Sequence, residues 1–161
     1  MTATATIEAA PDAVFAVLAD PSTHAAIDGT GWVREPRDQA PLTGAGQVFR
    51  MGMYHRNHPD GNYEMANRVE VFDAPTSIAW MPGSEAAGTG ELELGGWTWR
   101  YDLEPSGPQQ TAVTLTYDWS AVPPPVRELI QFPPFGSEHL EHSLQHLAAL
   151  ADAREDGAAR P

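Results

Sequence analysis

The amino-acid sequence predicts an α+β fold in which antiparallel strands form one sheet and the helices are segregated from it. Two observations support this prediction. Between Gln47 and Trp119, apolar residues repeatedly alternate with polar ones, which is the period of half-buried strands. Between Ser137 and Ala153 they recur every three or four residues, which is the period of an amphipathic helix. No helical pattern of comparable length precedes this stretch, so we expect one long C-terminal helix packed across one sheet.

The C-terminal helix has an apolar stripe formed by Leu140, Leu144, Leu147 and Ala151. Ser137 is a suitable N-cap, and the preceding Pro133-Pro134 pair stops the helix from extending toward the N-terminus. The stripe needs an apolar surface, and we expect the inner face of the sheet to provide it. The sequence after Asp152 is rich in Ala and charge. We therefore expect a single domain over residues 1–152 and a flexible tail over residues 153–161.

The N-terminal part of the chain predicts one strand and two short helices. Thr alternates with Ala and Ile over Thr2–Ile7, which is typical of a strand. Pro11 occupies a first helical position, and the helix that follows is expected to stop at Asp20-Pro21. A second helix is expected over Ser22–Ile27. The Gly- and Pro-rich region from Gly29 to Gly46 is expected to be loop, apart from a short strand at residues 32–34.

The strands begin with a predicted hairpin. Residues 47–56 place Phe49, Met51, Met53 and His55 on one face, and residues 63–71 place Tyr63, Met65, Asn67, Val69 and Val71 on one face. Between them, the sequence His58-Pro59-Asp60-Gly61 favours a tight turn. Further strands are expected at residues 78–80, 97–103 and 113–119, and residues 91–94 fit a strand extension within a longer loop. The predicted strands therefore follow one another along the chain as a meander, in which each strand is antiparallel to the one before it.

Composition excludes several classes of function. The chain has 161 residues, no cysteine and a formal net charge of −13, and its nine basic residues are scattered arginines. The absence of cysteine removes disulfides and thiol chemistry, and the acidic balance opposes nucleic-acid binding. No basic segment followed by an apolar run opens the chain, and no apolar run is long enough to span a membrane. We expect a cytoplasmic protein without a nucleic-acid or membrane partner.

Four segments carry a resemblance to a known superfamily. They are IEAAPDAVFAVLADPSTH near the N-terminus, VEVFDAPTSIAW, TAVTLTYDW and the closing FPPFGSEHLEHSLQHLAAL. In this order the chain resembles the START/Bet v 1-like (SRPBCC) helix-grip superfamily, and within it the bacterial polyketide cyclase/dehydrase group. The resemblance implies a curved antiparallel sheet wrapped around the C-terminal helix, with a hydrophobic pocket between them. The superfamily includes aromatic cyclases as well as lipid and hormone carriers, so it does not fix an activity.

The inner face of the predicted sheet is rich in aromatic and methionine side chains, which either fill the core or line a pocket for a flat ligand. The candidate ligand-binding residues are Phe49, Met51, Met53, Tyr63, Met65, Trp80, Trp97, Trp99, Tyr101, Tyr117 and Trp119, with Leu140, Leu144 and Leu147 from the helix. His55 and Asn67 share these faces. An unpaired buried polar group costs about 1–3 kcal/mol, so each must bond to protein, water or a ligand. Both are candidate catalytic residues, although a purely structural role is the simpler explanation for each.

Histidines at positions 139, 142 and 146 have a spacing that can place imidazoles around a metal on a helix. Their stripe lies beside the leucine stripe, and we interpret it as a solvated flank without a metal. The sequence contains no GxSxG, HExxH, Walker or dinucleotide-binding motif, so we predict no cofactor.

Three hypotheses follow for the function. The first is a site for a planar or polycyclic apolar molecule in an aromatase/cyclase-like enzyme, with His55 and a tyrosine hydroxyl moving protons. The second is a carrier or sensor with the same pocket and no chemistry. The third is a protein-interaction module of the Hsp90-activator type, whose inner side chains would fill the pocket. A monomer or a homodimer fits each, and the 29–46 loop and the 132–136 turn are expected to frame the pocket mouth.

Overall fold

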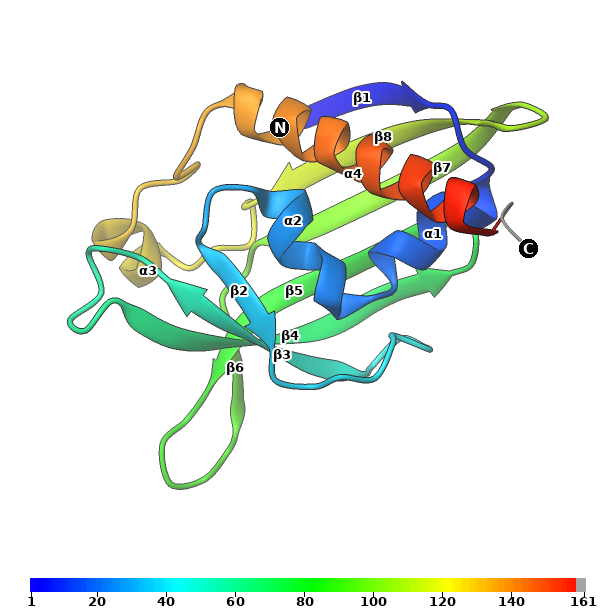
Figure 1. Ribbon diagram of the computed structural model, residues 1–161. Helices are drawn as coiled ribbons and strands as arrows, with labels where there is room; N and C mark the ends of the chain where they lie inside the picture. The colour runs from blue at the N-terminus through cyan, green and yellow to red at the C-terminus, as the bar shows by residue number, and fades with distance from the viewer. Residues whose placement is uncertain (159–161) are drawn as a thin grey trace.

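Residues 1–158, which this computed structural model describes, form an antiparallel sheet of eight strands with helices on one of its faces (Figure 1). The strand order is β1-β8-β7-β5-β4-β3-β2, and the short β6 pairs with β5. The strands are β1 (Thr2–Ile7), β2 (Val33–Pro36), β3 (Val48–Tyr54), β4 (Asn62–Asp73), β5 (Ser77–Glu85), β6 (Leu92–Leu94), β7 (Thr98–Gly107) and β8 (Gln110–Asp118). The predicted α+β class and meander are confirmed.

The two helices after β1 follow the sequence signals closely. Helix α1 (Pro11–Leu18) begins with Pro11 and buries Val14, Phe15, Val17 and Leu18. A single 3-10 turn (Pro21–Thr23) continues directly into α2 (His24–Asp28), which ends at Gly29 with φ of 68°. That left-handed conformation suits glycine, because a Cβ atom would be strained there. The turn at Gly29 sets the direction of the chain as it leaves Asp28.

Helix α4 (Ser137–Ala158) packs on β1, α1 and α2 and closes one side of the sheet (Figure 1). Leu140, Leu144, Leu147 and Ala151 are almost completely buried, as the apolar stripe predicts. The helix continues beyond the predicted end, through residues 153–158, where a flexible tail was expected, and residues 159–161 lie outside the described residues. Glu155 Oε1 accepts a hydrogen bond from Ala10 N at 3.0 Å. This contact joins the end of α4 to the start of α1. Because the two residues are far apart in the sequence, no local sequence pattern predicts it.

A β-bulge in β4 changes which residues face the core. The pairing of β4 with β5 shifts between Val69 and Val71, so that Val69 pairs with Trp80 and Phe72 pairs with Ile78. Phe72 therefore points inward and contacts Phe15 with a ring-centroid distance of 5.2 Å. The sequence analysis placed Val71 on the inner face, which is wrong because one extra residue inverts the alternation beyond the bulge.

Helix α3 (Pro124–Leu129) was not expected from the sequence. Three prolines precede and begin it, and proline at the first helical positions favours a helix because its φ is already fixed. None of its residues is buried, and Leu129 is 86% exposed. Arg127 donates hydrogen bonds to the carbonyl oxygens of Trp119 and Val122, which ties the helix to the end of β8.

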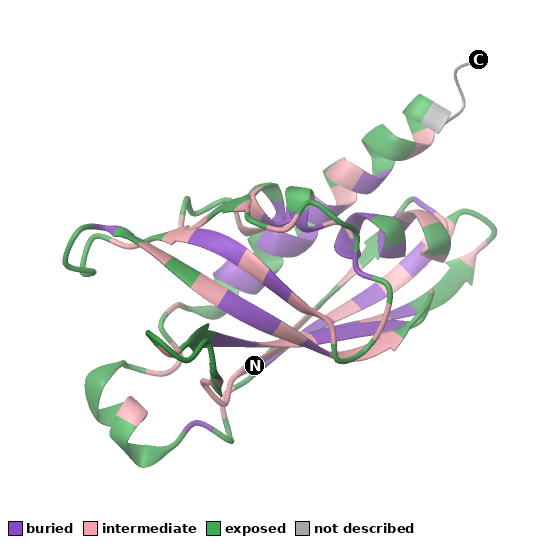
Figure 2. Cartoon of the chain, turned by 90° about the horizontal axis from the view of Figure 1, so that it is seen from below, coloured by how far each residue is buried: buried purple, intermediate pink, exposed green. Residues whose placement is uncertain are grey.

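Buried residues alternate with half-buried and exposed ones along the long strands, as Figure 2 shows, and they cluster on the side that faces the helices. The core lies between this face of the sheet, α1 and the leucine stripe of α4. Within the described part of the chain, no helix combines the length and the apolar character needed to cross a membrane.

Candidate functional site

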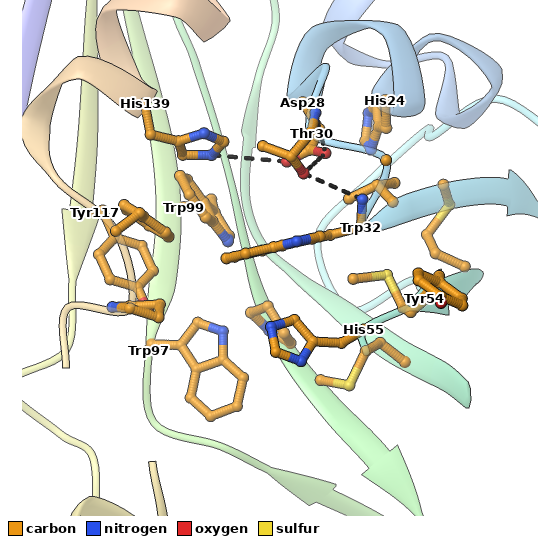
Figure 3. A pocket seen from close by; sticks show the side chains of 18 of the residues that line it. His24, Asp28, Thr30, Trp32, Tyr54, His55, Trp97, Trp99, Tyr117 and His139 are labelled. Carbon is orange, nitrogen blue, oxygen red and sulfur yellow. Dashed lines mark hydrogen bonds and ion pairs between the residues drawn. The ribbon is translucent and has the colours of Figure 1, made fainter. Parts of the chain in front are cut away.

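A cavity of about 1450 Å³ lies between the inner face of the sheet and the helices (Figure 3). Its walls come from β3, β4, β5, β7 and β8, from the end of α2 with the chain leading into β2, and from the segment that joins α3 to α4. Pockets for drug-sized ligands usually measure about 300–1000 Å³. The inner side chains therefore leave room for a polycyclic molecule.

One wall of the cavity is a stack of three rings. The indole of Trp80 lies between the imidazole of His24 and the phenol of Tyr101. The centroid distances are 4.9 Å and 5.9 Å, and the interplanar angles are 17° and 27°. His24 is fixed by a hydrogen bond of 2.8 Å between Nε2 and the carbonyl oxygen of Leu18. His24, Trp80 and Tyr101 all contribute to the cavity lining.

A second wall is formed by Trp99, Tyr117 and Phe135. Trp99 and Tyr117 are register partners in β7 and β8, and their rings are 4.6 Å apart. Phe135, from the turn before α4, stacks on Trp99 at 5.5 Å with an interplanar angle of 25°. The period-two pattern of the strands thus delivers both rings to the same face, and the turn adds a third ring from outside the sheet.

The polar part of the wall is the Asp28 group, which we define as Asp28, Thr30 and His139 (Figure 3). Asp28 Oδ2 accepts hydrogen bonds from the backbone N–H of Thr30, at 3.0 Å, and from the Thr30 hydroxyl. His139 Nε2 lies 3.6 Å from Asp28 Oδ1, which is slightly beyond hydrogen-bond distance. Both side chains are largely buried, with exposures of 10% and 12%. The group combines the end of α2 with the first turn of α4.

Trp32 completes the surroundings of the Asp28 group. Its backbone N–H donates to the Thr30 hydroxyl oxygen at 3.1 Å, and its indole extends below the group into the cavity (Figure 3). The indole and the imidazole of His55 form a T-shaped contact with a centroid distance of 5.0 Å. Trp32 therefore separates the Asp28 group from the hairpin end of the cavity.

Burial perturbs the titratable groups of the cavity. It lowers the pKa of His24, and it lowers the pKa of His139 despite the opposing charge of Asp28. Burial, with a smaller contribution from the charge of Asp28, raises the pKa of Tyr63 and of Tyr101. At neutral pH the two histidines are therefore uncharged and the phenols are protonated hydrogen-bond donors.

No protein-family model matches the sequence, and its comparison with curated proteins gives no significant match. Solved structures do match. The Zhui aromatase/cyclase from Streptomyces sp. R1128 aligns with a TM-score of 0.66 and 17% identity over 99% of this chain and 96% of its own. Protein Ms6760 from Mycobacterium smegmatis gives 0.65 and 17% over 95% and 90%, and ginseng major latex-like protein 151 from Panax ginseng gives 0.58 and 12% over 92% and 94%. The chain shares the helix-grip fold of these proteins. At these identities the likeness concerns the fold alone.

The helix-grip fold brings most of the candidate residues to one cavity. Those that border it are His55, Asn67, Phe49, Met51, Met53, Tyr63, Met65, Trp80, Trp97, Trp99, Tyr101 and Tyr117. They reach it because the inner faces of neighbouring strands are in register across β3, β4, β5, β7 and β8.

His55 and Asn67 do not form one site. Asn67 pairs with Phe49 across β3 and β4, and its Nδ2 donates to the Phe49 carbonyl oxygen at 3.3 Å. His55 follows the end of β3, six residues beyond Phe49, which corresponds to about 20 Å along an extended strand. Its Nδ1 accepts a hydrogen bond of 3.2 Å from Asn57 N. The two side chains therefore face different parts of the cavity.

Four candidate ligand-binding residues, which were predicted to line the cavity, do not border it. Leu140, Leu144 and Leu147 are buried in the core, because α1 and β1 cover the stripe of α4 before it reaches the cavity. Trp119 lies just after β8 and packs beside Tyr117, with ring centroids 5.6 Å apart. Its half-buried ring packs against the core and is not part of the cavity lining.

The interpretation of the helix histidines as a solvated flank is also wrong for two of them. His139 is buried beside Asp28, and His146 Nδ1 lies 3.0 Å from the carbonyl oxygen of Ile27. Only His142 is exposed. Positions 139, 143 and 146 form a second stripe beside the leucines, and Ser143 within it is buried. That period was visible in the sequence, but the packing of α2 against it was not.

The expected mouth segments contribute unequally. Residues 129–136 border the cavity, and so do residues 30–34 of the first loop. The second half of that loop turns away, because Leu42 is buried and its N–H donates to the Ala19 carbonyl oxygen at 2.7 Å. Residues 35–46 therefore do not border the cavity. Its mouth is formed by Trp32 and the segment that connects α3 to α4.

Proposed function

We propose that this protein binds a planar, largely apolar small molecule in the cavity of its helix-grip fold. The observation that supports the proposal best is an inner space of about 1450 Å³ whose walls are stacked aromatic rings. Aromatic side chains in such walls can contact a polycyclic ligand, and these contacts add to the gain from apolar burial. An interaction module is less well supported, since that hypothesis expects side chains to fill the space.

Neutral probes of increasing size test the proposal. Naphthalenemethanol, anthracenemethanol and pyrenemethanol should bind saturably by calorimetry, with affinity rising by about fivefold per added ring. Trp99→Ala should weaken binding by about tenfold, because Trp99 stacks within the wall. Trp119→Ala is the matched control, since Trp119 lies outside the cavity, and it should bind like the wild type. Absence of saturable binding by all three probes would refute the proposal.

Proton transfer on the bound molecule is a second candidate function. The position of His139 at the cavity, beside Asp28, is the observation that favours it. Its lowered pKa keeps the imidazole in the proton-accepting form beside the carboxylate of Asp28. In such a step the imidazole takes a proton from a carbon next to a ligand carbonyl group, and the C–H electron pair passes into an enolate. His55, the base favoured by the sequence, is the alternative acceptor at the same cavity.

Deuterium exchange into 2-tetralone, followed by NMR in deuterated buffer, distinguishes the two bases. If His139 is the acceptor, His139→Gln abolishes the protein-dependent exchange and His55→Gln retains it. The opposite pattern assigns the role to His55. No acceleration by the wild-type protein would remove this candidate and leave the carrier or sensor role.

A further inference from the structure

Asp28 presents an unused hydrogen-bond acceptor to the cavity. Its Oδ2 takes both hydrogen bonds from Thr30, while Oδ1 has only the 3.6 Å approach of His139. No buried polar side-chain atom in residues 1–158 lacks a partner, so the unbonded Oδ1 is accessible from the cavity that Asp28 borders. An incoming donor can therefore reach this oxygen without displacing an existing contact.

Asp28 also lacks a cationic partner within the described chain, where its one close basic group is His139. The arginines at positions 37, 50, 68, 100 and 154 pair with other carboxylates. His139 is held in its neutral form by burial and supplies no compensating charge at neutral pH. A largely buried carboxylate without a counter-ion is unfavourable, and a positive charge on a ligand would relieve that cost.

The surroundings of Asp28 suit a cation in a second way. The indoles of Trp32 and Trp99 lie below the Asp28 group and border the same part of the cavity (Figure 3). The negative charge of Asp28 also contributes to the raised pKa of the Tyr63 and Tyr101 phenols. Aromatic faces attract cations through their quadrupole, and they attract them more strongly when water is excluded. Carboxylate and rings together make this part of the cavity favourable for an ammonium group attached to an apolar body.

We propose that the cavity selects planar apolar molecules that carry a protonated amine, with Asp28 Oδ1 as the acceptor for the ammonium group. The proposal rests on the proposed binding function and adds the charge of the ligand to it. Positive charge at the mouth of the cavity would favour an anionic ligand instead. The exposed side chains of Arg34 and Arg56 border the cavity there. If these arginines dominate recognition, an anionic ligand is preferred, and the experiment must include one.

Three anthracene probes differ only in the group at position 9. They are aminomethylanthracene, which is protonated at neutral pH, the neutral anthracenemethanol and anthracenecarboxylate. Calorimetry at pH 7.5 with the wild-type protein should give an affinity for the ammonium probe about tenfold above that for the alcohol, and the weakest binding for the carboxylate.

Asp28→Asn removes the charge while it keeps an acceptor for Thr30. In this variant the ammonium probe should bind no more than about twofold better than the alcohol, whose own affinity should stay unchanged and thereby report an intact cavity. Asp152→Asn removes one charge at an exposed position of α4 and should keep the wild-type preference. Equal binding of the ammonium and alcohol probes by the wild type, or a preference for the carboxylate, overturns the proposal. Failure of the neutral alcohol to bind would instead refute the proposed binding function.

Discussion

The imidazole of His24 lies flat on the indole of Trp80, with ring centroids 4.9 Å apart. His24 is the first residue of α2, and Trp80 is in the middle of β5, so this contact fixes the helix against the inner face of the sheet. The neutral imidazole is part of the core, since it is buried and bonded to the carbonyl oxygen of Leu18. Protonation of His24 would place a positive charge in the buried core, which is unfavourable.

The first prediction is a loss of stability in mild acid that depends on His24. Burial lowers the pKa of His24 below its ordinary 6.5, so the unfolded chain takes up a proton more readily than the folded one. The contribution of neutral His24 is complete above pH 6.5 and is lost as pH falls toward the folded value. Urea midpoints between pH 7.5 and 5 should therefore decrease, and His24→Gln should flatten the curve. His139 contributes in the same direction. An identical slope in His24→Gln would contradict the assignment.

The second prediction concerns the leucine stripe of α4. Leu144 is 1% exposed, and Leu144→Ala should lower the free energy of unfolding by about 2–5 kcal/mol, because it removes a buried side chain and leaves a cavity. The adjacent Gln145 is exposed, and Gln145→Ala should change stability by less than about 0.5 kcal/mol. Denaturant titration measures both, and equal effects would show that the stripe is not in the core.

The sequence predicted the sheet and the long helix because their signals are local. Alternation places Trp99 and Tyr101 on one face whichever strands lie next to β7, and the period of Leu140 and Leu144 identifies a helix without reference to its partners. The signals failed where a distant contact decides the structure. The bulge that turns Phe72 inward depends on pairing with β5, and no pattern within β4 announces it.

The candidate site was predictable only in part, for the same reason. Trp80 and Trp99 were found because strand alternation points them inward. Asp28 and His139 are 111 positions apart, and they meet only because α2 and α4 pack together. A lone Asp before a glycine and a His on a helix flank are common surface residues. Their shared position at a cavity becomes visible only in the fold.

The third prediction separates backbone strain from steric overlap at Gly29. This residue has φ of 68°, and a Cβ atom there would lie 2.4 Å from Cε1 of His146. Gly29→Ala should therefore displace the His146 ring from the Ile27 carbonyl oxygen in addition to straining the backbone. Gly46 has φ of 88° and open space around its Cβ position, so Gly46→Ala isolates the strain. We expect a cost of about 1–2 kcal/mol at Gly46 and about 1–3 kcal/mol more at Gly29, from thermal or urea unfolding. Equal losses of unfolding free energy in Gly29→Ala and Gly46→Ala would show that the His146 ring moves aside without an energetic cost.

The fourth prediction tests the ordered end of α4. Glu155 accepts a hydrogen bond from Ala10 N at the start of α1, where the helix dipole also favours a negative charge. Glu155→Ala should reduce the free energy of unfolding by about 1 kcal/mol, whereas Asp156→Ala, at an exposed neighbouring position, should have little effect. Amide hydrogen exchange at Ala10 should accelerate in Glu155→Ala alone. Unchanged exchange there would mean that the end of α4 does not stabilise the start of α1.

The last prediction links the charge of His139 to ligand binding. Protonated His139 would place a positive charge 3.6 Å from Asp28 Oδ1 and compete with a ligand ammonium group for the same oxygen. Its pKa lies below the ordinary 6.5, because burial and the nearby His142 and His146 outweigh Asp28 and Glu138. Affinity for aminomethylanthracene should thus be constant between pH 6.5 and the pH 7.5 of the first measurement, where the probe is protonated, and fall as the solution becomes more acidic.

Two controls accompany this titration. Anthracenemethanol should bind equally well over the same pH range, because it carries no charge for protonated His139 to repel. His139→Gln should keep the affinity for the ammonium probe constant to lower pH, since the competing cation can no longer form beside Asp28. A fall in affinity that persists in His139→Gln would show that His139 is not the group responsible for it. An equal fall for the neutral alcohol would instead indicate that the cavity opens or unfolds in acid.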